Sequence, residues 1–261
     1  MSVSIKTNSE IRALARQALA GKWNMAALAV LLSGLAYLFL ALLDKGAEYL
    51  LEFPSIVLIC GLGFIVYGMQ RYFLRISRNT PCKPTDVYYG IVALPKGIFF
   101  LSIALYGLYL FAIIVPTLLV VGILSLFDSM VATENVEVLK WLCVGVVVLA
   151  GSWLVIRFSI SFAMAYYILI EEGPIGPINI LRKSSALMKG HQVQYLTLQL
   201  SFLGWAALSI LTLGIGAFWF APYSLVSSAI FFDEVANRQR ECTASSAFGY
   251  GRPGENLNQD S

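Results

Sequence analysis

The stretch VQYLTLQLSFLGWAALSILTLGIGAFWFAPYSLVSSAIFF, residues 193–232, decides the fold, because it runs for 40 residues without a charged side chain. As one α-helix it would be about 60 Å long, twice the roughly 30 Å thickness of a bilayer core. Its middle, residues 213–216 (LGIG), predicts a turn, because glycine readily ends helices. We therefore predict two membrane spans here, over residues 193–213 and 216–232.

Four further runs of the chain are also long and apolar. Of its 261 residues, 58% are hydrophobic and 13% are charged, whereas a soluble domain carries about 25% charged residues. The mean hydropathy is +0.75. Because about 20 apolar helical residues cross a bilayer, these runs predict spans over residues 25–43, 56–74, 98–126 and 141–168. The predicted fold class is an all-α, polytopic transmembrane helical bundle of about six spans, arranged as three hairpins.

The basic residues alternate between the loops of this six-span arrangement. Lysine and arginine are retained on the cytoplasmic side of a membrane protein. The segments that would face outward hold Lys45 and Lys140, and Arg157 lies within a span. All others of the 18 basic residues lie in segments that would face inward: Lys6, Arg12, Arg16, Lys22, Arg71, Arg75, Arg78, Lys83, Lys96, Arg182, Lys183, Lys189, Arg238, Arg240 and Arg252. The pattern predicts a multi-pass protein with both termini in the cytoplasm.

A short motif precedes each predicted hairpin. Residues 18–22 (ALAGK), 93–97 (ALPKG) and 186–191 (ALMKGH) each stand directly before an apolar run. Nine residues before the first alanine of each motif stand Ser9, Pro84 and Pro177, which are residue types that begin helices. We predict three repeats, each an amphipathic helix on the cytoplasmic face followed by a two-span hairpin. The middle copy is the poorest, because a proline interrupts its end.

The first copy has the clearest helical pattern. Thr7 and Glu10 have the spacing of a capping box, and Gly21 can end the helix in the left-handed conformation. The predicted apolar face contains Ile11, Leu14, Ala15, Ala18 and Leu19. Residues 1–24 are therefore predicted to form a cytoplasmic amphipathic helix that lies on the membrane surface. In the third copy the predicted apolar face contains Ile178, Leu181, Ser185 and Met188, with a helix end at Gly190. Residues 233–261 are predicted to be a cytoplasmic, disordered tail.

The third copy also holds the polar candidates Arg182, Lys189 and His191, the last being the only histidine of the chain. These side chains either punctuate a helix end among lipid headgroups or bind lipid phosphate or an acidic group of a partner. One histidine without a nearby acid, thiol or second histidine is a poor catalytic or metal site. The four cysteines lack CxxC spacing, and no nucleophile, metal or phosphate-loop motif is present. We expect no enzyme activity, no catalytic or metal site, and no cofactor.

Within the predicted spans, Arg157 is the deepest ionisable side chain, and such a residue raises a functional hypothesis. It either snorkels or bonds to another helix, or it binds a substrate. Trp153 is one turn away and suits a cation–π contact, and Gln199 and Tyr195 are the polar side chains expected at the same depth. Pro116 and Pro222 should kink their helices and expose backbone carbonyls. Gly61, Gly68, Gly107, Gly145 and Gly204 should allow close helix packing.

Several stretches of the chain resemble a known family. They are residues 188–191 (MKGH) after Ser184 or Ser185, residues 200–205 (LSFLGW), residues 214–216 (GIG) and residues 222–223 (PY). Residues 15–28 (ARQALAGKWNMAAL) complete the likeness. The chain thereby resembles the bacterial integral membrane proteins of domain-of-unknown-function family 975. Its turn at residues 171–174 (EEGP) departs from the family pattern, in which one residue separates an aspartate from a proline. The resemblance implies a polytopic protein of the bacterial cytoplasmic (inner) membrane and carries no biochemical activity.

We therefore expect a membrane protein without catalytic chemistry, acting as an accessory or interaction component of a membrane assembly. Its expected partners are membrane lipids and a membrane or cytosolic protein, but not nucleic acid, because no clustered basic and aromatic surface is evident. One alternative is a small transporter or channel component that uses Arg157 and the two prolines. Another is a lipid-handling protein that uses Lys189 and Arg182. The sequence leaves the substrate, the partner and the oligomeric state open.

Overall fold

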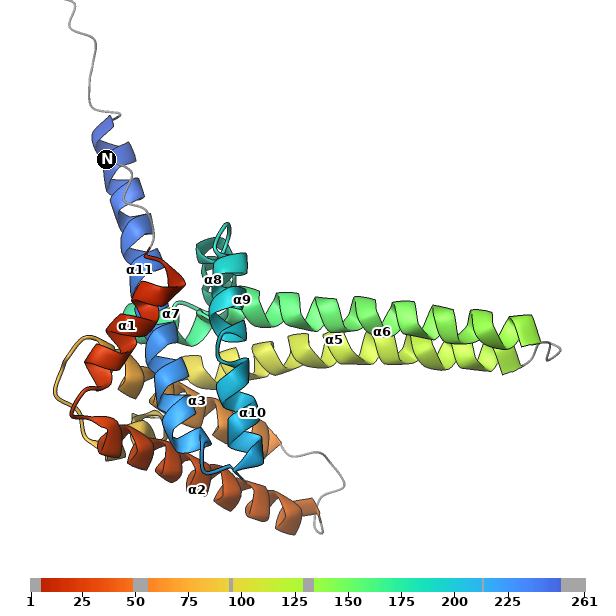
Figure 1. Ribbon diagram of the computed structural model, residues 1–261, viewed down its shortest axis with the longest axis horizontal. Coiled ribbons are helices and arrows are strands. Elements are labelled where there is room, and N and C mark those ends of the chain that lie inside the picture. Colours follow the sequence, from red (N-terminus) through yellow and green to blue (C-terminus); the bar gives the residue numbers. More distant parts are fainter. Residues whose placement is uncertain (1–5, 49–55, 94–95, 129–133, 213, 250–261) are drawn as a thin grey trace, which may run out of the picture.

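The computed structural model describes residues 6–48, 56–93, 96–128, 134–212 and 214–249, and this part of the chain is helical with no strand (Figure 1). The predicted all-α fold class is therefore confirmed. In chain order the elements are α1 (Asn8–Leu19), α2 (Trp23–Glu48), α3 (Ile56–Ser77), the 3₁₀ helix η1 (Pro84–Tyr88), α4 (Tyr89–Ala93), α5 (Lys96–Asp128), α6 (Glu134–Phe162), α7 (Ala165–Glu172), α8 (Pro177–Leu187), α9 (Gln192–Leu200), α10 (Leu203–Leu211) and α11 (Ala217–Gly249).

Helix α1 begins at the predicted capping box. The backbone N–H of Thr7 donates to Glu10 Oε2 at 2.6 Å, and the backbone N–H of Glu10 donates to Thr7 Oγ1 at 3.4 Å. The first of these bonds lowers the pKa of the Glu10 carboxyl below its ordinary value. The buried residues Ile11, Ala15, Ala18 and Leu19 pack with residues of α2, α3 and α11. Other helices of the protein therefore cover this face of α1. The sequence instead predicts that the membrane surface covers it.

The middle copy of the repeat does not form one helix. Residues 84–88 form η1, which begins at a proline, and a short α4 follows it. Here the backbone of η1 lies directly against α3, because a Cβ atom built on Gly68 would lie 1.7 Å from the carbonyl oxygen of Val87. The hydroxyl of Tyr88 donates to the carbonyl oxygen of Leu32 in α2 at 2.8 Å. These contacts fix η1 between α2 and α3.

Helix α8 begins at Pro177, as predicted, and Gly190 has the expected positive φ of 84°. The face that α8 buries matches the predicted one only in part. The helix buries Ile180, Ser184 and Leu187, and Met188 directly after it is fully buried as predicted, whereas Ile178 is 70% exposed. The hydroxyl of Ser184 donates to the carbonyl oxygen of Ser161 at 2.8 Å. This buried hydrogen bond ties α8 to the end of α6, which explains why a serine lies on the buried face.

The core consists of two clusters of buried side chains that meet around α3 and α11. The larger cluster joins α11 to α5, α7, α8 and α9, and it includes the stacked rings of Tyr167 and Phe232, 5.1 Å apart. The smaller cluster joins α1, α2, α3 and η1, and Val226 of α11 contributes to it. Because α11 takes part in both clusters, it is the central element of the folded body.

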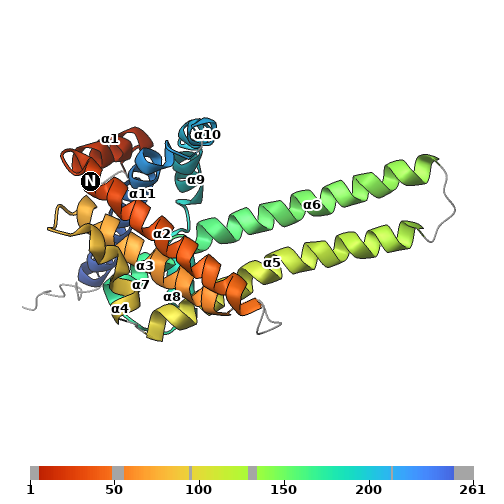
Figure 2. The same cartoon turned by 90° about the horizontal axis from the view of Figure 1, so that it is seen from below.

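Helices α5 and α6 run side by side and project from this body (Figures 1 and 2). Their outer surface is apolar: Phe111, Leu118, Leu149 and Trp153 are each 60% or more exposed. Soluble proteins rarely expose such large apolar surfaces. Four described helical segments are long and apolar enough to cross a membrane: Trp23–Lys45, Lys96–Phe127, Val138–Glu172 and Gln192–Leu211. These four do not include α3 or α11, so the arrangement of six spans in three hairpins stays a prediction.

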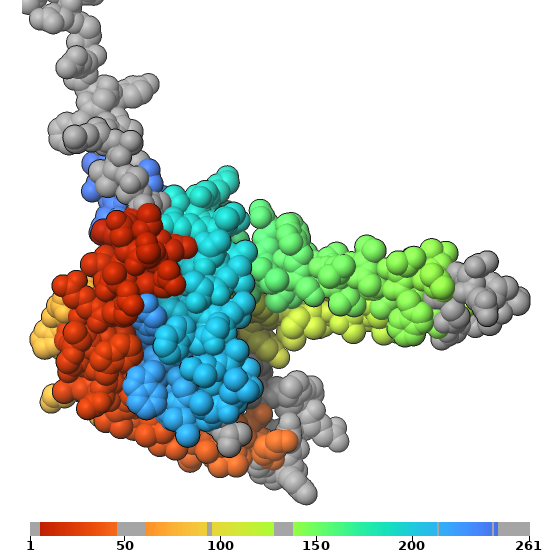
Figure 3. All heavy atoms as spheres, in the orientation of Figure 1, coloured from red at the N-terminus to blue at the C-terminus, as the bar shows by residue number. Residues whose placement is uncertain are grey.

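The third predicted hairpin consists of α9 and α10, followed by the first half of α11. Its turn lies where the sequence predicts it, and Gly214 has a positive φ of 90°. Helix α11 then continues through residues 233–249, which we assign from the sequence to a disordered tail, so that assignment is wrong for these residues. In both views α9, α10 and α11 run across the direction of α5 and α6. In the space-filling view, α1 and α9–α10 flank α11 (Figure 3).

Candidate functional site

Three helices bring charged side chains to one place. Helix α3 ends at Ser77, so that Arg78 follows it directly, and α7 ends with Glu171 and Glu172. Both ends are followed by a residue in the left-handed region, Asn79 with φ 54° and Gly173 with φ 74°. Asp233 lies in the middle of α11. Burial of the apolar residues of α3, α7 and α11 thereby places their charged neighbours together at the surface.

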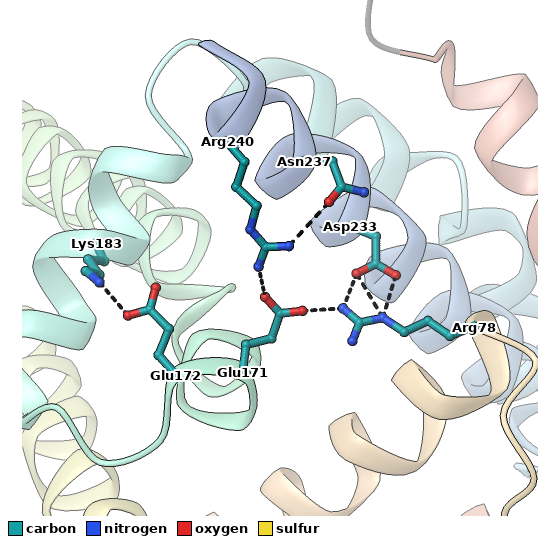
Figure 4. Close-up of polar contacts among 7 residues, drawn as sticks. All are labelled: Arg78, Glu171, Glu172, Lys183, Asp233, Asn237 and Arg240. Atoms are coloured by element: carbon teal, nitrogen blue, oxygen red, sulfur yellow. Dashed lines mark hydrogen bonds and ion pairs between the residues drawn. The ribbon is translucent and has the colours of Figure 1, made fainter. Parts of the chain in front are cut away.

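Arg78 is the centre of an ion cluster (Figure 4). Its Nε lies 3.2 Å and 3.1 Å from the two carboxylate oxygens of Asp233, and its Nη2 contacts both Asp233 and Glu171. The other carboxylate oxygen of Glu171 is contacted by Arg240 of α11. The Glu171 side chain is only 15% exposed. Two arginines and two carboxylates therefore balance one another across α3, α7 and α11.

The ion cluster carries fixed charges. The hydrogen bond with Asp233 raises the pKa of the Arg78 guanidinium above its ordinary value. Burial lowers this pKa, and the hydrogen bond with Glu171 raises it. A guanidinium stays protonated in proteins. The cluster can therefore clamp three helices or bind charged groups, but Arg78 cannot serve as an acid or a base.

A pocket of about 470 Å³ adjoins the cluster between α7, α8 and α11. Its apolar residues include Ile168, Leu187 and Phe232. On its rim Lys183 of α8 pairs with Glu172 of α7, and both side chains are well exposed, at 53% and 41%. Exposed pairs of this kind contribute little to stability. The pair of Glu172 and Lys183 therefore adds little to the stability of the contact between α7 and α8. Its main effect is to place one negative and one positive charge on the rim of the pocket.

A second hollow of about 470 Å³, here called the α8 groove, is lined by two of the residues proposed from the sequence, Arg182 and Lys189. Both side chains are exposed; Arg182 belongs to α8, and Lys189 lies two residues beyond its end. The groove has apolar walls, formed by Phe162, Ile178 and Leu181. Within the described residues, no carboxylate forms an ion pair with either cation. The groove thus combines two cations with apolar walls, a combination that suits contact with lipid headgroups.

His191 does not line the α8 groove. It is the residue before α9, and its backbone N–H donates to Met188 O at 3.0 Å. Partial burial, and secondly the charge of Arg238, lower the pKa of His191 below its ordinary value. The imidazole is therefore less readily protonated than an ordinary histidine, and the joint binding role of Lys189 and His191 stays a prediction.

Arg157 bonds to another helix, but its partner differs from the predicted ones. Its Nη1 donates to Gln192 Oε1 at 3.3 Å, and its guanidinium lies over the Trp153 ring at 5.6 Å. The predicted cation–π contact with Trp153 is thereby confirmed. Gln199 instead bonds to Ser228 of α11 at 3.0 Å. Arg157 thus reaches toward the start of α9, because the end of α6 lies only about 8 Å along the helix axis from it.

The two prolines lie inside helices, as predicted, and neither takes part in the ion cluster. Pro116 is in α5 and Pro222 is in α11. A Cβ atom built on Gly151 of α6 would lie 2.8 Å from the ring of Pro116. This proline therefore packs against α6 where a glycine leaves room, and its transport role stays a prediction.

Sequence reasoning did not select Arg78, Glu171, Asp233 or Arg240 as site residues. Their partners are distant in the chain, since 155 positions separate Arg78 from Asp233. One signal was available in the sequence. Glu171 and Asp233 directly follow apolar runs on the predicted inner side, where basic residues also gather, so opposite charges at neighbouring helix ends could have been paired.

The comparisons with known proteins concern the family alone. The sequence model of a family described as "Protein of unknown function (DUF975)" matches residues 1–239. No curated protein and no solved structure matches the chain. The match covers nearly all of the chain, including α8, three of the ion-cluster residues (Arg78, Glu171 and Asp233) and α11 up to residue 239. The chain therefore belongs to the DUF975 family, whose members are proteins of unknown function.

Proposed function

We propose that this chain is a multi-pass protein of the bacterial cytoplasmic membrane that holds anionic lipid headgroups in the α8 groove, as an accessory component without catalytic chemistry. The main observation behind the proposal is that two cations, Arg182 and Lys189, line the same hollow as three apolar side chains. These side chains are Phe162, Ile178 and Leu181. Cations attract anionic headgroups, and the apolar walls suit the first part of the acyl chains. The same side chains are exposed, so a lipid can reach them.

The neighbouring lysine supports the assignment by contrast. Lys183 is next to Arg182 in the sequence, yet its ammonium pairs with Glu172 at the other pocket, between α7, α8 and α11. A charge that serves only helix packing would be expected to find such a partner. Arg182 and Lys189 instead leave their charges available to a ligand.

The lipid proposal predicts a loss of bound anionic lipid when the groove loses its cations. Each basic residue near a membrane surface contributes about 1 kcal/mol to binding, so the double variant Arg182→Ala/Lys189→Ala should retain phosphatidylglycerol roughly 30-fold more weakly. The measurement is mass spectrometry of lipids that remain bound to protein purified from mixed phosphatidylglycerol and phosphatidylcholine membranes. Phosphatidylcholine retention should not change.

Lys183→Ala is the matched control, because it removes the same charge from the same helix outside the groove. It should retain lipid as the unaltered chain does. Equal retention by the double variant, or an equal loss in Lys183→Ala, would refute the groove as a specific headgroup site.

The topology proposal is that both termini face the cytoplasm and that the chain crosses the membrane six times. In a chain whose native cysteines are replaced by serine, a membrane-impermeant thiol reagent should label Lys45→Cys and Ile215→Cys in intact cells. Thr85→Cys and Glu241→Cys should be labelled only after the cells are broken. Labelling of Thr85→Cys in intact cells would overturn the orientation. Protection of Ile215→Cys alone would show that α9 and α10 enter the membrane without crossing it.

A further inference from the structure

Two arginines of α1 differ from those of the ion cluster, because no carboxylate of the described residues pairs with them. Arg12 and Arg16 lie one helical turn apart. In the described part of the chain neither forms an ion pair, whereas Arg75 pairs with Asp86 at 3.1 Å and Lys6 pairs with Glu234 at 2.7 Å. Like charges one turn apart destabilise a helix. A nearby anion would remove this repulsion.

The two guanidiniums line a pocket of about 260 Å³ between α1, α9–α10 and α11. Its other polar residues are Ser9, Ser201 and Tyr223, and its apolar wall is formed by Phe202 and Trp205. Figure 3 shows the elements that enclose it, with α1 on one side of α11 and α9–α10 on the other. The pocket is distinct from the α8 groove, with which it shares no residue.

The hydrogen-bonding groups of this pocket suit an anion with several oxygens. Arg12 Nε donates to the carbonyl oxygen of Asn8 at 3.3 Å, which leaves its two terminal nitrogens for a ligand. Arg16 adds a second planar fork of donors, and such forks match phosphate oxygens in pairs. The indole N–H of Trp205 is a further donor. Among the described residues that line the pocket there is no carboxylate.

The pocket is held in shape before a ligand arrives. The capping box fixes the start of α1, and Asn8 Nδ2 donates to Thr197 Oγ1 of α9 at 2.8 Å. The hydroxyl of Tyr223 donates to the carbonyl oxygen of Arg12 at 3.4 Å. These contacts tie α1 to both other walls. Binding therefore costs little reorganisation, because the two arginines already share one opening.

We infer that Arg12 and Arg16 form a binding site for one phosphate group, carried by a lipid headgroup or by a small soluble phosphate ester. Two guanidiniums balance the two charges of a phosphate monoester and attract the single charge of a lipid phosphodiester, and the volume admits a phosphate with its ester carbon atoms. Trp205 is 54% exposed beside the pocket, and Leu203 is 59% exposed. Trp is enriched where membrane and water meet, so both sources can reach the same site.

The test measures binding of two probes to the full-length protein. The soluble arm is calorimetric titration with glycerol 3-phosphate of protein in phosphatidylcholine nanodiscs. The lipid arm measures retention of phosphatidylglycerol, in the Arg182→Ala/Lys189→Ala background so that the α8 groove does not contribute. Arg12→Ala and Arg16→Ala should each weaken binding in at least one arm by about tenfold or more, because hydrogen bonds to charged groups are strong.

Two further variants make the result specific. Lys22→Ala removes a cation that lies just beyond α1 and donates to Asn79 Oδ1, and it should not change binding. Arg16→Lys keeps the charge without the planar fork, so it should bind with intermediate strength. Circular dichroism of each variant checks that the fold is retained.

The two arms identify the source of the phosphate. A loss confined to the lipid arm assigns the site to headgroups, a loss confined to glycerol 3-phosphate assigns it to soluble esters, and a loss in both assigns it to the phosphate group itself. Unchanged binding in both arms, or an equal loss in Lys22→Ala, overturns the inference. The soluble arm with Arg182→Ala/Lys189→Ala should match the unaltered chain, so this site and the α8 groove can fail independently.

Discussion

Replacing Gly68 with alanine should destabilise the protein by on the order of 3 kcal/mol, because overpacked sites cost about 1–3 kcal/mol even where side chains can move aside. The added Cβ would lie 1.7 Å from the carbonyl oxygen and 2.8 Å from the carbonyl carbon of Val87. Both are backbone atoms of η1, so relief requires η1 to move away from α3. Val87 is fully buried, and its movement would open the smaller core cluster.

The measurement is the thermal unfolding midpoint of the purified protein in detergent. Unfolding is monitored as the loss of the monodisperse peak in size-exclusion chromatography. Gly34→Ala in α2 is the matched control, because nothing lies within 4 Å of its Cβ position. Alanine is favoured over glycine in a helix by up to about 1 kcal/mol, so this control should raise the midpoint or leave it unchanged. Equal midpoints for the two variants would contradict the close contact between α3 and η1.

Replacing Glu171 with glutamine should cost about 2 kcal/mol, between the small effect of exposed ion pairs and the roughly 3–5 kcal/mol of buried ones. The change leaves Arg78 and Arg240 next to each other without the carboxylate that they share. Because Glu171 is 15% exposed, water compensates only in part. The measurement is again the unfolding midpoint.

The next residue supplies the control for this prediction. Glu172→Gln breaks one pair with Lys183, in which both side chains are more than one-third exposed. Its cost should be below about 1 kcal/mol and should vanish in 1 M salt, where the screening length is about 3 Å. If both variants lost the same stability, the ion cluster would not be the clamp that joins α3, α7 and α11.

The sequence predicts local features of this fold better than it predicts partners. The capping box of α1, the turn at Gly214 and the contact of Arg157 with Trp153 each depend on residues within a few positions of one another. Local backbone chemistry suffices for these predictions. The choice of Gln192 over Gln199 as the partner of Arg157 depends on how α6 meets α9, which no local pattern encodes.

The glycine predictions show the same limit. All five glycines that we selected lie in apolar helices, yet the structure uses them differently. At Gly68 the added Cβ would meet backbone, and at Gly61 it would meet Leu40, but Gly107, Gly145 and Gly204 have nothing within 4 Å. Successive residues of a helix point in different directions around its axis. Only the tertiary arrangement decides which of these directions faces a neighbouring element. The ion cluster escaped prediction for the same reason.

Helix α11 has a mechanical consequence for the whole molecule. It is one rod of 33 residues, about 50 Å long, and Pro222 lacks the N–H that would bond to the carbonyl of Phe218, so bending is easiest there. A bend at that point would move the segment from Tyr223 onward, which includes Asp233 and Arg240. Arg240 lies about 27 Å along the axis from Pro222, so a bend of about 10° would displace it by roughly 5 Å, enough to part it from Glu171. A ligand that contacts Tyr223 would therefore act on the same segment of α11 that holds the ion cluster together.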